Sequence, residues 1–539
     1  MPASRFDALV DEVYRTQLRW SPSFATSLGV HEYDQLLADP SRAQVEREVS
    51  KQREWLAELE RMGQSEAVPA DRRVDLGAML YTLRLGLFQA TELRNWEKNP
   101  DLAMDLFDHL FALLVRDTWP LEKRLSAIAA RLSASPAFFE AGRERFGENM
   151  PHLWVEIAME SAQAAPATLE AVTKLAATAP AALRADVERA VKVAHGSIAG
   201  HRDWLQDVLD ARSQTIEGGW SIGADRMRRL VELRALGLSA DEILARGHAL
   251  VKEKEAEVQA AAEAVLRKAG EPSGDTPVQK ATAVLARDHP ETFADVLTAY
   301  RDSVRASRDF VGSAGIATLP ENDRLDVIET PAYLRHIIPF AAYFPPARFE
   351  PTQLGVYMVT PRPVEQFPHA EIQNTTVHEG YPGHHLQLTM ANANPSTARI
   401  LVGATETIEG WAHYCEEMMF RHGYGAGEAT RFVQAKDQLW RACRIVIDVR
   451  IHDGSMTFDQ GVGMLVEKTG MPEDGARAEL KRYTQTPGYQ LSYLLGKVLI
   501  GELAAKAAAR GLAQRQFHDR FLTAGSLPLG LLSRDLGLA

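Results

Sequence analysis

TVHEGYPGHHLQ, residues 376–387, is the most informative stretch of the chain, because it gathers three of the sixteen histidines within eight positions beside Glu379. Neutral imidazole is a preferred ligand of Zn²⁺, and an adjacent carboxylate can take a proton from metal-bound water. The stretch therefore predicts a metal site in which Glu379 is the catalytic base. In a zincin motif two histidines lie four residues apart on one helix, but position 382 here is proline, so the helix must break inside the site.

The break leaves two candidates for the second histidine ligand. On an undistorted helix of ~100° per residue, His385 would face the same way as His378, whereas His384 would lie ~120° away. Pro382 lacks an N–H and clashes with the carbonyl four residues back, and Gly383 allows a backbone path closed to other residues. The helical phase favours His385 and a kink would favour His384, so both stay open.

A second segment, ETIEGWAHYCEE at residues 406–417, offers the third ligand. Glu409, His413 and Glu416 are spaced i, i+4 and i+7, which places them on one face of a helix. One of the three would bind the metal, and the other two would orient the side chain of that ligand. Two histidines and a carboxylate suit a single Zn²⁺ ion, although manganese or cobalt could substitute.

Most of the chain is expected to be helical. Apolar positions recur at intervals of three and four, with abundant alanine, in residues 1–315 and again in residues 396–515. Ser239 opens a capping box with the glutamate three residues on, and Pro277 and Pro290 mark the next two helix starts.

The amino-acid composition changes near residue 316, where proline, aromatic and β-branched residues become frequent. Several short strands fit this stretch better than helix, and LGVYMVT at 354–360 is the best strand candidate. We therefore predict a mainly α protein with a small β-sheet next to the metal site. Residues 1–315 would form a helical scaffold and residues 316–539 the metal-site region, together one compact body.

Composition restricts the classes of function. The net charge of −12 argues against nucleic acid or an anionic membrane as a general partner. Cys415 and Cys443 cannot form a disulfide framework and are expected to be inert buried thiols. The N-terminal stretch does not resemble a signal peptide, and no run of ~18 apolar residues is present, so a cytoplasmic location is expected.

HEGYPGHHLQ followed by EGWAHYCEE resembles the bacterial family catalogued as domain of unknown function 885, related to the gluzincin metallopeptidases. This resemblance implies a large helical zincin-like body. It implies His378 and His384 as histidine ligands, Glu379 as the general base and Glu409 as the glutamate ligand, with His385 and His413 as alternates. Further family-like segments are SLGVHEYDQLLAD near the N-terminus, RIVIDVRIHDG at 444–454 and PGYQLSYLLGK at 487–497.

The last of these segments is expected to complete the site. Tyr493 could donate a hydrogen bond to the oxyanion that forms when water attacks a carbonyl. Gln490 and Lys497 follow helical spacing with Tyr493, and Lys497 or Arg482 could hold a substrate carboxylate. An extended substrate would pair with an edge strand, for which residues 354–360 are the candidate.

These residues predict a zinc hydrolase that cleaves the peptide bonds of short peptides, as a carboxypeptidase, small oligopeptidase or dipeptidase. One alternative is a zinc amidase acting on a non-peptide or isopeptide amide. Another, from a different class, is a helical protein that keeps a structural zinc and binds peptides without cleaving them. The sequence does not fix the substrate or the oligomeric state, for which a homodimer is the candidate.

Overall fold

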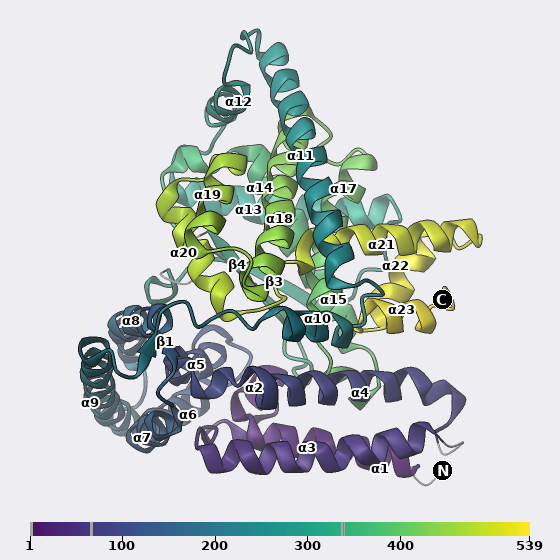
Figure 1. Cartoon of the computed structure of the whole chain (residues 1–539). Coiled ribbons are helices and arrows are strands. Elements are labelled where there is room, and N and C mark those ends of the chain that lie inside the picture. The colour runs from purple at the N-terminus through teal and green to yellow at the C-terminus, as the bar shows by residue number, and fades with distance from the viewer. Residues whose placement is uncertain (1–3, 65–67, 336–337, 339) are drawn as a thin grey trace. The chain divides into compact units, whose positions relative to one another are not determined.

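A computed structural model describes residues 4–64, 68–335, 338 and 340–539, and helices dominate it (Figure 1). The mainly helical fold with a small sheet is confirmed. The described chain divides into two compact units. Unit 1 comprises Met1–Ser221, Pro331–Pro339 and Ala347–Leu354, and unit 2 comprises Ile222–Thr330, Phe340–Pro346 and Gly355–Ala539. The predicted division at 315/316 stays a prediction.

Unit 1 is built mostly from helices, and its core consists mostly of leucine, alanine and valine side chains from α5 to α9. Its helices are α1 (Arg5–Trp20), α2 (Pro22–Leu28), α3 (Arg42–Gly63), α4 (Arg73–Phe88), α5 (Asp105–Val115), α6 (Leu121–Ser133), α7 (Ser135–Arg145), α8 (His152–Ala176) and α9 (Ala181–Ala211). Two very short parallel strands, β1 (Met150–Pro151) and β2 (Thr215–Ile216), pair with each other. Short helical turns are η1 (His31–Tyr33), η2 (Ala70–Arg72), η3 (Gln89–Leu93), η4 (Asn95–Glu97), η5 (Pro100–Ala103) and η6 (Ala332–Leu334).

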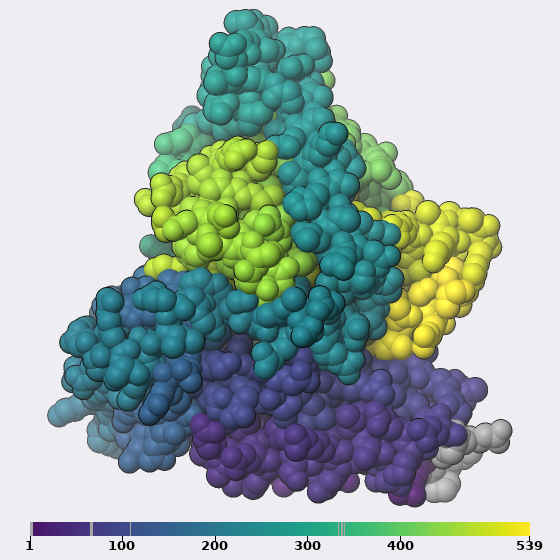
Figure 2. All heavy atoms as spheres, viewed as in Figure 1, coloured from purple at the N-terminus to yellow at the C-terminus, as the bar shows by residue number. Residues whose placement is uncertain are grey.

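Unit 2 carries the predicted metal-site residues. Its helices are α10 (Ala224–Leu233), α11 (Ala240–Ala269), α12 (Pro277–Leu285), α13 (Phe293–Ser313), η7 (Val364–Gln366), α14 (His369–Glu379), α15 (His384–Asn392), α16 (Thr397–Ile400), α17 (Thr405–Arg421), α18 (Glu428–Asp453), α19 (Phe458–Thr469), α20 (Glu473–Gln485), α21 (Ser492–Ala509), α22 (Gln514–Thr523) and α23 (Leu529–Asp535). Helix α18 is buried along most of its length, and α11 packs along it (Figure 1). In the view of Figure 2, the side chains of α11, α19 and α20 lie side by side on the visible surface of this unit.

Short local patterns account for several helix starts. The capping box at Ser239 is present and opens α11, and Pro277 is the first residue of α12. The start predicted at Pro290 falls too early, because α13 begins at Phe293. There Thr292 accepts the Asp295 N–H and forms a second capping box, and this cap sets the boundary.

The predicted small sheet has three strands in the order β3 (Asp323–Glu329), β5 (Gln353–Val359) and β4 (Ala341–Phe344). Strand β5 confirms the strand predicted at 354–360, but the edge role predicted for it is wrong. It lies between two neighbours, so its backbone groups are already used, and its side chains are almost all buried. Strands β4 and β5 run antiparallel, with Tyr343 opposite Tyr357.

Among the described helices, none is both long and apolar enough to span a lipid bilayer.

Candidate metal centre

The break predicted at Pro382 is a sharp turn between two helices. Helix α14 ends at Glu379, the Tyr381–Pro382 peptide is cis, and α15 begins at His384. The Gly383 N–H donates to the carbonyl oxygen of Val377 at 3.0 Å. A Cβ at Gly383 would lie 1.9 Å from the carbonyl oxygen of His378, so only glycine lets the chain fold back this closely.

Helix α17 fastens this turn from the other side. The indole N–H of Trp411 donates to the carbonyl oxygen of Pro382 at 2.8 Å, and the Gln387 amide donates to the carbonyl oxygen of Thr407 at 2.9 Å. At Gly410, α17 touches α21, because a Cβ there would lie only 2.4 Å from the carbonyl carbon of Gly496. The Glu-Gly-Trp segment thus holds Glu409 against the turn.

These contacts bring His378, His384 and Glu409 together. One ligand atom of each lies within 4.8 Å of the other two, so the group could hold a metal ion. The Glu409 carboxylate lies 3.8 Å from Nε2 of His378 and 3.5 Å from Nε2 of His384. Burial alone would raise the pKa of Glu409, but His384, together with the charges of His378 and His413, holds it at about 2.

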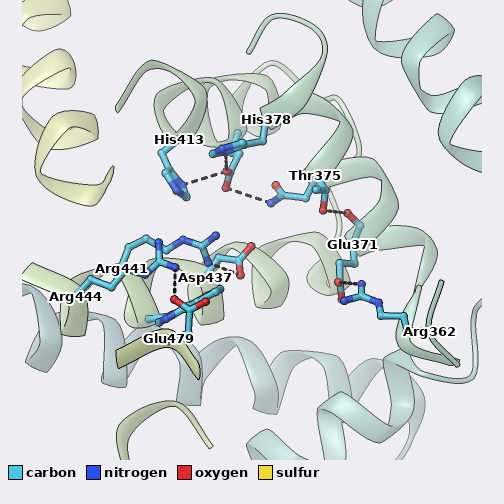
Figure 3. A network of polar contacts seen from close by, with 12 residues as sticks. Arg362, Glu371, Thr375, His378, His413, Asp437, Arg441, Arg444 and Glu479 are labelled. Carbon is cyan, nitrogen blue, oxygen red and sulfur yellow. Dashed lines mark hydrogen bonds and ion pairs between the residues drawn. The ribbon is translucent and has the colours of Figure 1, made fainter. Parts of the chain in front are cut away.

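The other nitrogen of His378 faces a second acid. Its Nδ1 lies 2.7 Å from Oε1 of Glu416, and Nδ1 of His413 lies 3.1 Å from the same oxygen (Figure 3). His378, His413 and Glu416 therefore form a second buried group that could hold a metal ion. Burial would lower the pKa of His378, but the bond to Glu416 and the nearby carboxylates of Glu379 and Glu409 raise it to about 9.

Amide side chains fix Glu416 in this position. The amide nitrogen of Asn374 donates to Oε2 of Glu416 at 3.1 Å, and Gln434 donates both to Asn374 and to the backbone carbonyl of Glu416. A carboxylate held in this way orients the imidazole it accepts from. Glu416 therefore leaves the opposite nitrogen of His378, Nε2, directed toward Glu409 and His384.

Glu379, the predicted base, is the last residue of α14 and is half-buried. Within the described chain its carboxylate makes no hydrogen bond or ion pair. Its charge is close enough to contribute to the raised pKa values of the buried phenols of Tyr300 and Tyr357, which burial dominates. The carboxylate next in sequence to His378 is thus available for a proton.

Two tyrosines approach the group, Tyr489 from the segment before α21 and Tyr493 from the first turn of α21. The Tyr489 hydroxyl donates to Oε1 of Glu409 at 3.1 Å, and the Tyr493 hydroxyl lies 3.5 Å from that of Tyr489. Asp448 of α18 holds this segment by accepting the backbone N–H groups of Gly488 and Leu491. Sequence reasoning missed Tyr489, because helical spacing counted from Tyr493 has no meaning before the helix begins at Ser492.

His385 belongs to neither group. Its Nδ1 lies 2.9 Å from the Tyr343 hydroxyl, and its Nε2 lies 3.5 Å from Asp323. Tyr381 donates to Asp323, and Arg308 pairs with it at 3.1 Å. Burial opposes the charge of Asp323, but these partners hold its pKa at about 2. The Tyr343 ring of this cluster lies nearly parallel to the His384 ring. The cluster therefore packs beside the His378–His384–Glu409 group.

The residues predicted to bind substrate have partners of their own. Lys497 pairs with Glu417, and its burial lowers the pKa of the ammonium group. Gln490 is fully buried, and its amide donates to Thr486. Arg482 of α20 reaches solvent and pairs with Glu479 at 2.7 Å. Their predicted roles remain predictions.

Both cysteines are buried and unpaired, as expected. Burial raises the pKa of Cys443 to about 12 and that of Cys415 well above its ordinary value. Neither thiol is therefore a reactive thiolate near neutral pH.

Comparison with known proteins relates the chain to two solved structures. One, described as a "putative lipoprotein of unknown function" from Shewanella oneidensis, is 22% identical and superposes with a TM-score of 0.79 over 100% of both chains. The other, described as "the putative lipoprotein" from Colwellia psychrerythraea, is 18% identical, with a TM-score of 0.81 over 98% of each chain. Both show the same fold. Comparison with curated proteins gave no match. A family profile described as "Bacterial protein of unknown function (DUF885)" matches residues 22–536, so the chain belongs to this family.

Proposed function

We propose that the protein is a zinc-dependent peptidase of short peptides. The observation that carries the proposal is the convergence of His378, His384 and Glu409 around one point, with the carboxylate of Glu379 at the end of the same helix as His378. A metal-binding group with an adjacent free carboxylate is what hydrolysis by an activated water requires.

The donor set fits zinc. Two neutral imidazoles and one carboxylate form a three-ligand set that leaves a fourth position open. The bond of Nδ1 to Glu416 leaves Nε2 of His378 as the ligand atom. When bound, the ion would lower the pKa of a coordinated water to ~7.

The protein's own groups would then carry the proton steps. Glu379 takes the proton of the attacking water and passes it to the leaving amine. Tyr493 donates a hydrogen bond to the oxyanion that develops on the carbonyl oxygen. Tyr489 keeps the Glu409 carboxylate oriented through its hydroxyl.

The test is Glu379→Gln, which keeps the shape of the side chain but removes its basicity. We expect metal content to stay at the wild-type level and peptide cleavage to fall about 10²- to 10⁴-fold. Metal is measured by elemental analysis and cleavage with a peptide mixture, with and without chelator. Glu365→Gln is the matched control, since this exposed glutamate precedes α14. A fully active Glu379→Gln protein would refute the role of the base.

The same assay separates the alternative functions. Metal retained with no cleavage of any peptide favours the peptide-binding protein with structural zinc. Cleavage restricted to amides outside the peptide backbone favours the amidase.

The compartment is also a proposal. The sequence favours the cytoplasm, while the two similar structures, described as lipoproteins, raise the cell envelope as the alternative. Fractionation of cells that express the full-length gene decides between the two.

A further inference from the structure

Beside the metal groups lies a cluster of arginines, of which the sequence singled out only Arg482. Arg441 and Arg444 are one turn apart on α18, and Figure 3 shows both on the helix that faces His378 and His413. The guanidinium carbon of Arg444 lies 4.8 Å from the centre of the Tyr493 ring. That ring lies 5.9 Å from the His413 ring, so one aromatic side chain separates Arg444 from the candidate centre.

The cluster carries more positive than negative charge. Arg444 and Arg482 share a single carboxylate, that of Glu479, at 2.9 and 2.7 Å. Arg441 pairs with Asp437 at 3.0 Å. Three guanidinium groups thus face two carboxylates, and Arg444 is only 3% exposed. Because Arg482 reaches solvent, the excess is only partly buried, and such an excess of positive charge favours the binding of an anion.

Donor groups remain open in this cluster. Nη1 of Arg441 donates to Asp437, whereas its buried Nε finds no partner in the described part of the chain. Arg444 donates from Nε to the Tyr483 hydroxyl and from Nη2 to Glu479, and its Nη1 makes no hydrogen bond within the described residues. These guanidinium N–H groups could therefore donate hydrogen bonds to an anion bound beside the candidate active site.

We propose that Arg441 and Arg444 bind the terminal α-carboxylate of a peptide, so that the enzyme removes short fragments from the carboxyl end. Guanidinium groups match a carboxylate better than any other side chain, because their planar N–H pairs can donate to both oxygens. This inference rests on the proposed peptidase function and names the substrate class of that site. An acidic side chain near the scissile bond offers the same chemistry, and the experiment separates the two.

The experiment uses the metal-loaded full-length protein and matched peptides. One peptide has a free carboxyl end, one is amidated there, and a third is amidated but carries glutamate near its end. We expect kcat/KM to fall about 10- to 100-fold on amidation, the loss typical of one charge-assisted hydrogen-bonded contact. Recovery of the rate in the third peptide would instead assign the arginines to an acidic side chain and overturn the proposal.

The variant that tests the site is Arg441→Gln, because Arg441 is less embedded than Arg444. It should raise KM for the free-acid peptide and bring the ratio of kcat/KM for acid over amide close to one. A merely structural effect would slow both peptides equally and would overturn the assignment. Arg477→Gln, an exposed change on α20, should leave the ratio unchanged.

Failure of this inference differs from failure of the proposed function. Equal cleavage of acid and amide by the wild-type protein would remove only the carboxylate site. No cleavage of any peptide by the metal-loaded protein would remove both.

Discussion

At the scale of single residues, the feature that organises the candidate site is the pair of opposed contacts made by His378. One ring nitrogen is held by Glu416 and the other points to Glu409 and His384. The orientation of the imidazole is thus set by a carboxylate outside the His378–His384–Glu409 group. This arrangement predicts that Glu416 influences metal affinity through His378.

We therefore expect Glu416→Gln to weaken zinc binding about 10- to 100-fold, the range found when an orienting partner of a ligand is lost. Competition with a chromophoric chelator measures the affinity. Glu428→Gln, an exposed change whose ion pair with Lys268 lies at the surface, serves as control. If instead Glu416 is itself a ligand of the His378–His413–Glu416 group, the affinity loss should be far larger.

The sequence could predict the residue types of the site but not all of their positions. His378, His384, Glu409 and Glu416 were all candidates. The choice between His384 and His385 depends on the path of the turn at Gly383, which helical phase alone cannot give. Arg444 was missed because its neighbours Tyr483 and Tyr493 come from two other helices.

At the scale of elements, the crossing of α17 and α21 positions the carboxylate of the candidate site. The two helices touch backbone to backbone, since a Cβ at Gly496 would lie 2.2 Å from the carbonyl oxygen of Glu406. Glu409 lies one turn further along α17, so any separation of the helices displaces it. Small residues permit such close approach only where both helices have them.

Gly496→Ala should therefore lower stability by about 2 kcal/mol or more, as forced overpacking does, and should weaken metal binding as well. Gly501→Ala on the same helix is the matched control, because a Cβ there meets nothing within 4 Å. That change should raise stability by up to about 1 kcal/mol. Chemical denaturation of both variants measures the difference, and equal effects would contradict the tight crossing.

Elements were predictable where the signal was local. The capping box of α11 and the strand at β5 followed from short patterns. Strand order did not, because β3, β4 and β5 follow one another along the chain, yet the last of them lies between the other two. The buried side chains along β5 fit a central strand, whereas an edge strand with one exposed face would alternate.

At the scale of the whole molecule, one contact within unit 1 joins two segments that are far apart in sequence. His31 lies between two carboxylates, with Nδ1 2.7 Å from Asp34 and Nε2 2.8 Å from Glu350, and stacks on Trp119. Both ring nitrogens can donate only when the imidazole is protonated. Burial lowers the pKa of His31, but the hydrogen bonds to Asp34 and Glu350 outweigh it and raise the pKa above its ordinary value.

This direction gives the sign of a pH effect. A histidine whose pKa is raised by folding stabilises the protein fully below its ordinary pKa of ~6.5, and the contribution is lost as pH rises through the raised value. The urea concentration at the unfolding midpoint should therefore decrease as the pH is raised from weakly acidic to alkaline values. In His31→Gln this part of the fall should be missing, and an identical pH profile in both proteins would exclude the mechanism.

The global composition of the fold was predictable, and its division along the chain was less so. Helical periodicity gave the class, since most helices bury one face. The chain returns to unit 1 at Pro331–Pro339 and again at Ala347–Leu354, and such returns leave no local pattern from which the sequence could predict them. That the chain forms a single body stays a prediction.

These returns limit how the gene can be dissected. Glu350 and Phe349, which bind His31 and the carbonyl oxygen of Leu28, are encoded more than 300 codons after their partners. A fragment that stops after Ser221 would keep the histidine and lose its second carboxylate, and a fragment that starts at Ile222 would carry that carboxylate with no histidine to meet it. No single cut yields either half intact, so separate study of the units requires fused, discontinuous segments.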